Sequence, residues 1–162
     1  MLTFRQAIAA WLIVTALFAS ITTSFGQANQ QDLLTLMRRI TALAQEGRFG
    51  EAVGLARKLA TDAERASGPQ SPLTAMTLVV LAQALQAQGE ATEAEKVLRR
   101  ALAIREKTLG ANHADVAAVL STLGQIALSQ NRLKDAERDT LRAISIDERT
   151  LGPDHLTPRW CA

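Results

Sequence analysis

Apolar residues between positions 31 and 151 recur three, four and seven positions apart, which is the spacing of one face of an α-helix. Three runs show this most clearly: Leu36, Ile40 and Leu43; Leu78, Leu81, Ala82 and Leu85; Leu120, Leu123, Gly124 and Ala127. A second helical pattern follows each run after a short break. The spacing predicts an all-α chain with helices over residues 31–46, 50–67, 73–88, 92–109, 115–130 and 134–151.

The breaks between these helices carry the residues that end a helix. Gly47, Gly89 and Asn131 follow the first helix of each pair, and both residue types tolerate the left-handed backbone of a C-cap. Gly68 and Gly110 follow the second helices, each next to turn-forming residues. The chain is therefore expected to fold as a series of helical hairpins.

The hairpins are copies of one another at a spacing of 42 residues. Under this shift Arg105–Gly110 (REKTLG) falls on Asp147–Gly152 (DERTLG), and His113 falls on His155. A composition rich in Ala and Leu does not explain matches at Gly, Glu, Arg and His in one register. The period divides a repeat domain of residues 29–155 into units of about 33–74, 75–116 and 117–155, followed by a tail, 156–162.

The repeat pattern resembles the tetratricopeptide repeat (TPR), and more narrowly the 42-residue form found in kinesin light chains and many bacterial proteins. The matching residues are the Leu123-Gly124 pair, the alanines at the helix crossing (Ala94 and Ala136) and the Ala-rich strip of the second helix (Ala101 and Ala143). The REKTLG and DERTLG endings match the long form as well. The resemblance implies a right-handed α-solenoid of three antiparallel helix–turn–helix units. It also implies a concave groove for peptides or partner proteins, lined by the first helices, and no catalytic residue.

By analogy with the family, ten first-helix residues would line the groove: Arg38, Thr41, Gln45, Val79, Val80, Gln83, Gln86, Ser121, Thr122 and Gln125. Gln83 and Gln125 are repeat-equivalent, and an amide can bond both the N–H and the C=O of an extended peptide. The asparagine typical of the long-form groove is replaced by Arg38, Val80 and Thr122. The expected ligand is an uncharged or mixed segment; the alternative is a plain, solvated inner face.

Residues 1–28 have the pattern of a secretory signal peptide cut after Ala28. One basic residue, Arg5, precedes the apolar run 7–19, and small residues follow. The alternative is an uncleaved membrane anchor over residues 7–25, which the Ser and Thr residues of its second half disfavour. The chain is expected to be exported, to the periplasm or outside the cell, and to contact a membrane only if this segment is retained.

Composition and charge exclude several classes of partner. Removal of residues 1–28 takes away one basic residue and lowers the formal net charge from +2 to +1, so no phosphate-binding stripe and no nucleic-acid partner are expected. Beyond residue 28 only Phe49 and Trp160 are aromatic, too few for a base-stacking surface. The single cysteine, Cys161, excludes a disulfide framework and a cysteine-rich metal site.

His113 and His155 are either a metal or acid–base pair or loop residues copied with the repeat. Equivalent positions lie on the order of 10 Å apart and no third ligand completes a set, which favours copied loop residues. The clusters Arg105–Lys107 and Asp147–Arg149 are either a recognition stripe or, as alternating charge favours, a solvated helix face. No catalytic triad or phosphate-binding motif is present, so neither enzyme activity nor a cofactor nor a metal is expected.

The sequence therefore predicts an exported, non-enzymatic scaffold that binds a peptide or partner protein on the concave face of its repeats. Two alternatives stay open. The chain could be the amino-terminal regulatory portion of a truncated larger enzyme, such as a CHAT-domain protease. It could also self-associate through the uncapped C-terminal end, where the helix face is partly apolar and partly polar. The residues of that face are Asp139, Thr140, Leu141, Ile144, Ser145 and Ile146.

Overall fold

The structure, a computed structural model, describes residues 31–151. These residues fall into two compact units, divided between Arg39 and Ile40. The described part of the first unit is helical and continues as a helix to residue 45 of the second. The candidate site residues lie in the second unit, with the exception of Arg38.

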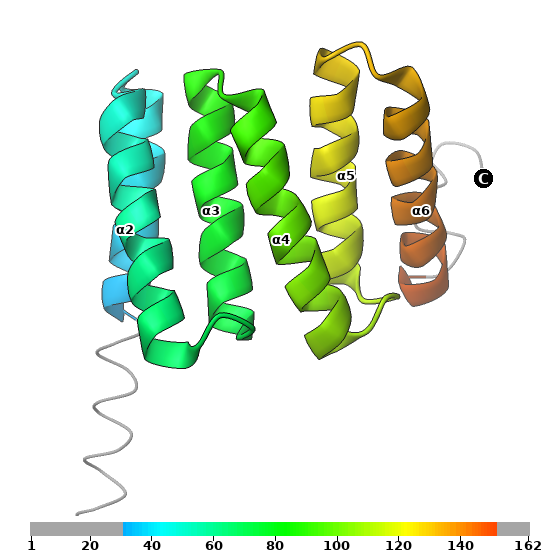
Figure 1. The fold of residues 1–162 in the computed structure, drawn as a ribbon, viewed down its shortest axis with the longest axis horizontal. Coiled ribbons are helices and arrows are strands. Elements are labelled where there is room, and N and C mark those ends of the chain that lie inside the picture. The colour runs from blue at the N-terminus through cyan, green and yellow to red at the C-terminus, as the bar shows by residue number, and fades with distance from the viewer. Residues whose placement is uncertain (1–30, 152–162) are drawn as a thin grey trace, which may run out of the picture. The chain divides into compact units, whose positions relative to one another are not determined.

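The second unit contains five further helices, each packed against the next in chain order (Figure 1). They are α2 (Phe49–Ser67), α3 (Pro72–Gln88), α4 (Ala91–Leu109), α5 (Ala114–Ser129) and α6 (Leu133–Leu151). Over residues 31–151 no strand is present. The all-α prediction is confirmed, and the bounds of these five helices differ from the predicted ones by one residue at most.

The hairpin turns have the backbone that the breaker residues predict. Gly47, Gly89 and Asn131 have φ angles of 76°, 91° and 59°. Asn131 is the one non-glycine residue with a positive φ among the described residues, and asparagine is among the few residue types that adopt this conformation routinely. The three hairpins therefore close through equivalent left-handed turns.

Side chains cap the first helices of the second and third repeats. At the start of α3, the Ser71 hydroxyl accepts a hydrogen bond from the amide of Thr74 at 3.1 Å, and Pro72 follows as the first helical residue. At the start of α5, Nδ1 of His113 accepts from the amide of Asp115 at 3.1 Å. The capping role agrees with the interpretation of His113 as a loop residue of the repeat.

Small residues lie where the helices of a hairpin cross. Ala52 and Ala94 are fully buried and Ala136 is nearly so. Gly124 on α5 lies close to α6, because a Cβ added there would lie 2.6 Å from Oγ1 of Thr140. The Leu-Gly pair of the repeat thus admits a close contact between α5 and α6.

The face of α6 that the sequence treats as exposed is only partly so. Leu141 and Ile144 are 58% and 37% exposed, whereas Ile146, which the sequence analysis places on this face, is buried. Asp139 differs from the expectation, because it is 5% exposed. Its Oδ1 accepts a hydrogen bond from Nε of Arg138, whereas its Oδ2 has no hydrogen-bond partner among the described residues. Its repeat equivalents, Leu55 and Val97, are partly buried as well. The position of Asp139 in the repeat therefore faces inward.

Several predictions fall outside the described residues. These are the signal peptide (1–28) or membrane anchor (7–25), His155 and the tail (156–162). Within residues 31–151, no helix combines the length and the apolar character needed to cross a membrane. The same part of the chain contains no group of three or more His, Cys, Asp or Glu residues placed to hold a metal ion.

Candidate functional site

One side of α3 remains accessible although the helix is strongly apolar. Val79, Gln83 and Gln86 are spaced by four and three residues, so they follow one another along one face of α3. Gln83 is exposed, and Val79 and Gln86 are half-buried. Met76, also half-buried, lies one turn before Val79 on the same face. These four residues form an accessible strip along α3.

The equivalent side of α5 carries Ser121, Thr122 and Gln125. Gln125 is exposed and the other two are half-buried. The Thr122 hydroxyl donates to the backbone oxygen of Ala118 at 3.0 Å, so its proton is already used within α5. The strip on α5 therefore offers Gln125 as its exposed amide, and Leu128, at the position equivalent to Gln86, is 59% exposed.

Val80 differs from the groove expectation. It is 8% exposed, and its neighbours one turn away on α3, Thr77 and Ala84, are buried as well. The side chain therefore belongs to the core rather than to the accessible strip. The family's asparagine position is polar in the third repeat, at Thr122, and buried and apolar in the second.

The three candidates of the first repeat are all exposed. Arg38 lies in the first compact unit, whereas Thr41 and Gln45 lie in the second. The strips on α3 and α5 both lie in the second unit. On them, Gln83 and Gln125 make no side-chain hydrogen bond to any other described residue, and both amides remain available to a ligand.

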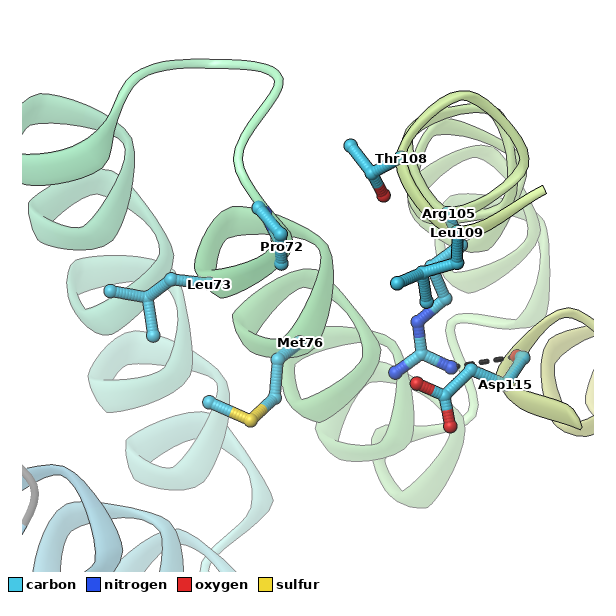
Figure 2. Close-up of a pocket in the computed structure, with 7 residues that line it drawn as sticks. All are labelled: Pro72, Leu73, Met76, Arg105, Thr108, Leu109 and Asp115. Carbon is cyan, nitrogen blue, oxygen red and sulfur yellow. Dashed lines mark hydrogen bonds between the residues drawn. The ribbon is translucent and has the colours of Figure 1, made fainter. Parts of the chain in front are cut away.

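A pocket of about 280 Å³ lies at the amino-terminal end of the α3 strip. Figure 2 shows that it is bordered by the start of α3, the end of α4 and the start of α5. Its lining residues are Pro72, Leu73, Met76, Arg105, Thr108, Leu109 and Asp115. Met76 belongs to both the strip and the pocket, so the pocket continues the accessible face of α3.

The pocket combines an apolar lining with one charged wall. Nη1 of Arg105 donates a hydrogen bond of 2.8 Å to the backbone oxygen of Asp115, which fixes the guanidinium at the edge of the pocket (Figure 2). Sequence reasoning missed this site. Met76 on the groove face of α3 was an available signal, but the REKTLG motif gave no sign that Arg105 reaches the start of α5.

The second helices carry ion pairs that join one repeat to the next. Nη2 of Arg100 on α4 lies 2.7 Å from Oε1 of Glu64 on α2, and this hydrogen bond lowers the pKa of Glu64. Arg142 on α6 pairs in the same way with Glu106 on α4. The charge cluster around Glu106 is therefore more than a solvated helix face, because Glu106 connects two repeats.

Glu95 on α4 is a carboxylate that pairs with arginines of two repeats. It accepts hydrogen bonds from Arg99, one turn along α4, and from Arg132, just before α6. Partial burial raises the pKa of Glu95, but the hydrogen bonds from Arg99 and Arg132 outweigh it and the pKa lies below its ordinary value. Glu95 thus ties the second repeat to the turn of the third.

Solved structures with a similar fold include a kinesin light chain from Podosopora anserina with nearly identical TPR-like repeats. Its identity to this chain is 24%, with a TM-score of 0.67, over 73% of this chain and 56% of that one. BtubC (BKLC) from P. vanneervenii is 24% identical, with a TM-score of 0.63, over 74% of this chain and 49% of that one. The chain thus spans about half the length of these proteins, and the likeness shows a shared α-solenoid fold.

No curated protein matches the chain significantly. The family model described as "Tetratricopeptide repeat" matches twice, at residues 32–107 and 76–149. The two matches overlap on the second repeat and together cover most of the sequence. With the helical hairpins and their 42-residue period, they show that the chain belongs to the tetratricopeptide repeat family.

Proposed function

We propose that this protein is an interaction scaffold that holds an extended, uncharged or mixed-charge segment of a partner protein along the strips of α3 and α5. Tetratricopeptide repeats generally mediate binding between proteins and are typically non-enzymatic. The observation that carries the proposal is the pair of repeat-equivalent amides, Gln83 and Gln125, which are exposed and make no hydrogen bond within the described residues.

The chemistry of the face supports this class of ligand. Each glutamine amide offers donors and an acceptor, which suits the alternating N–H and C=O groups of an extended backbone. The pocket beside Met76 accepts an apolar side chain, and Arg105 and Asp115 present both signs of charge at its edge. The strips lack the paired Lys and Arg that clamp a carboxylate bidentately.

Site-specific photo-crosslinking tests the proposal in cells that express the protein. A photoreactive residue replaces Gln83 or Gln125 in separate variants, and a third variant carries it at Lys96, an exposed position on α4. We expect both glutamine positions to form the same covalent protein adduct, and the Lys96 position to form none. Adducts found equally at Lys96, or different proteins at Gln83 and Gln125, would remove the α3 and α5 strips as the binding face.

Substitution sharpens the same test. Gln83→Ala and Gln125→Ala should weaken capture of the crosslinked partner, because each removes a donor and an acceptor, while the helical circular dichroism spectrum stays unchanged. A Met76→Ala variant should weaken it as well if an apolar side chain occupies the pocket. Capture that is unaltered in all three variants would discard the face as the binding site.

We propose further that the protein is exported, with residues 1–28 as a cleaved signal peptide; this rests on the sequence pattern of Arg5 and the apolar run 7–19. Mass spectrometry of the protein purified from cells tests the cleavage, because a cleaved chain begins at Asn29 and lacks the mass of residues 1–28. A mass that includes residues 1–28 in a membrane fraction would instead support the anchor over residues 7–25.

The alternative function is a regulatory repeat portion of a larger enzyme, such as a CHAT-domain protease. Sequencing the coding region downstream of residue 162 decides it. Further repeats followed by a His/Cys pair in frame would favour the enzyme, and their absence would favour the scaffold.

A further inference from the structure

The ion pairs between second helices repeat with the sequence. Glu64 on α2 pairs with Arg100 on α4, and the residues 42 positions later, Glu106 and Arg142, pair between α4 and α6. The same shift carries Glu106 onto Glu148 of α6, and it carries Arg100 back onto Lys58 of α2. The series thus ends in an acid on α6 and begins with a base on α2.

Glu148 and Lys58 are both exposed. Neither forms an ion pair with any residue in the described range. Glu148 is the equivalent of Glu64 and Glu106, and Lys58 is the equivalent of Arg100, but within residues 31–151 neither has the partner that its equivalents have. Each end of the repeat series therefore carries half of the pair that joins repeats inside it.

A second set of residues shows the same arrangement. Arg132 bonds Asp135, three residues on, and reaches back to Glu95 of the preceding repeat. The first-repeat equivalent of Arg132 is Arg48, which bonds Glu51, the equivalent of Asp135. The remaining equivalent, that of Glu95, is Glu137 in the third repeat.

Glu137 is exposed on α6 and has no ion pair within residues 31–151. If the first repeat of a second copy followed α6 as the third repeat follows the second, Glu137 would face Arg48 of that copy as Glu95 faces Arg132. Arg48 already bonds Glu51 and Glu46, and the hydrogen bonds to these acids raise its pKa. Glu137 and Glu148 on α6 thus match Arg48 and Lys58 in one register, as Glu95 matches Arg132, which likewise keeps its bond to Asp135.

The apolar surface of α6 fits the same register. Leu102 on α4 packs against a buried cluster that includes Ala117 and Leu120 of the next repeat. Its equivalent on α6 is Ile144, which is 37% exposed. An apolar position that is covered between repeats is therefore open at the end of the described series.

We propose that the α6 face of one copy binds the α2 side of a second copy, with Glu137 opposite Arg48 and Glu148 opposite Lys58. The contact continues the repeat-to-repeat interface that the chain already contains between α2, α4 and α6. It is head-to-tail, because the two surfaces differ, and such contacts build open chains of copies unless the rotation closes them into a ring.

Charge reversal tests the proposal by sedimentation velocity on the full chain over a range of concentrations, with reductant present because the chain contains Cys161. Glu148→Lys and Lys58→Glu each place like charges opposite each other and should weaken association about three- to tenfold, given the small energies of exposed ion pairs. The double variant restores opposite charges, since every copy supplies both surfaces, and should associate as the unchanged chain does. Lys96→Glu on α4 is the matched control and should have no effect.

Three outcomes overturn the proposal. The first is a monomer at every concentration, which assigns the α6 face to another occupant. The second is association that neither single reversal weakens, as expected if residues 1–28 or Cys161 join the copies. The third is a double variant that stays as weak as the single variants, because a general loss of folding does not recover on charge exchange. Circular dichroism of each variant confirms that helicity is retained.

Discussion

The second helices α4 and α6 are copies of one pattern in different surroundings. α4 packs against both α3 and α5, whereas α6 packs on α5 and, through Arg142, on α4, with no described helix after it. At equivalent positions Leu98 is fully buried and Thr140 is exposed, and Leu102 packs on the next repeat while Ile144 is open. The repeat determines which positions point toward a neighbour, and the neighbour determines whether they are buried.

The first helices of these two hairpins, α3 and α5, also differ at equivalent positions. Ala82 of α3 and Gly124 of α5 are equivalent, as are Leu98 and Thr140. In the third repeat the threonine approaches so closely that its partner position holds no Cβ. The second and third hairpins therefore have different side chains at the equivalent helix crossing. Substitutions at matched positions separate the contributions of these side chains.

The largest expected effect is at Leu98. Leu98→Ala deletes a fully buried side chain between neighbours and should lower the free energy of unfolding by about 2–5 kcal/mol. Thr140→Ala, the matched change in α6, should alter it by about 0.5 kcal/mol or less, because the residue is exposed. Urea denaturation followed by circular dichroism measures both. Equal losses would contradict the view that the surroundings of α4 and α6 differ.

The next largest effect is expected at Gly124. Whether Gly124→Ala raises or lowers the free energy of unfolding should depend on the side chain at position 140. Gly124→Ala places a Cβ 2.6 Å from Oγ1 of Thr140, an overpacking that should cost about 1–3 kcal/mol, against a gain in helix propensity of about 1 kcal/mol. In a Thr140→Ala background the clash is absent, so Gly124→Ala should stabilise the protein. A double-mutant cycle in urea measures the coupling. Additive changes would mean that the two residues do not touch in solution.

A smaller difference is expected between Leu102 and Ile144. Leu102→Ala removes a half-buried contact with the next repeat and should lower the free energy of unfolding by about 1–2 kcal/mol, whereas Ile144→Ala should cost less than about 1 kcal/mol. Thermal unfolding at low protein concentration, where copies are separate, makes the comparison. If Ile144→Ala were the costlier change even then, another segment of the chain would have to cover α6.

The smallest expected effect is a change in the stability contributed by Glu95 at acidic pH. The pKa of Glu95 is below its ordinary value in the folded protein, so its ion pairs stabilise the fold at neutral pH and lose this effect as the pH falls through the folded pKa. Glu95→Gln should therefore be less stable than the unchanged protein at pH 7, and the difference should shrink on acidification below about pH 4.5. Glu137→Gln, at the equivalent exposed position, should follow the unchanged protein throughout. Unfolding midpoints in urea from pH 7 to 3 test this, and a gap for Glu95→Gln that widens in acid would contradict it.

The sequence determined the helices, their bounds and the period, because apolar spacing and turn residues act locally. Gly89 and Asn131 end their helices through a backbone preference that needs no neighbour. The family resemblance also followed from the sequence, since the crossing alanines and the REKTLG and DERTLG endings recur in register and Leu123-Gly124 matches the repeat motif. The candidate strip on α3 was predicted in part: Gln83 and Val79 are accessible, and Val80 is not.

Tertiary structure alone decided which repeated positions are filled, paired or open. The pocket beside Met76 depends on how the end of α4 meets the starts of α3 and α5, and the pairing of Glu106 depends on where α6 places Arg142. Asp139 is buried for the same reason, although its charge suggests a surface residue. Periodicity states the direction of a side chain on its own helix; burial and pairing also need the position of the adjacent helix, which local spacing does not contain.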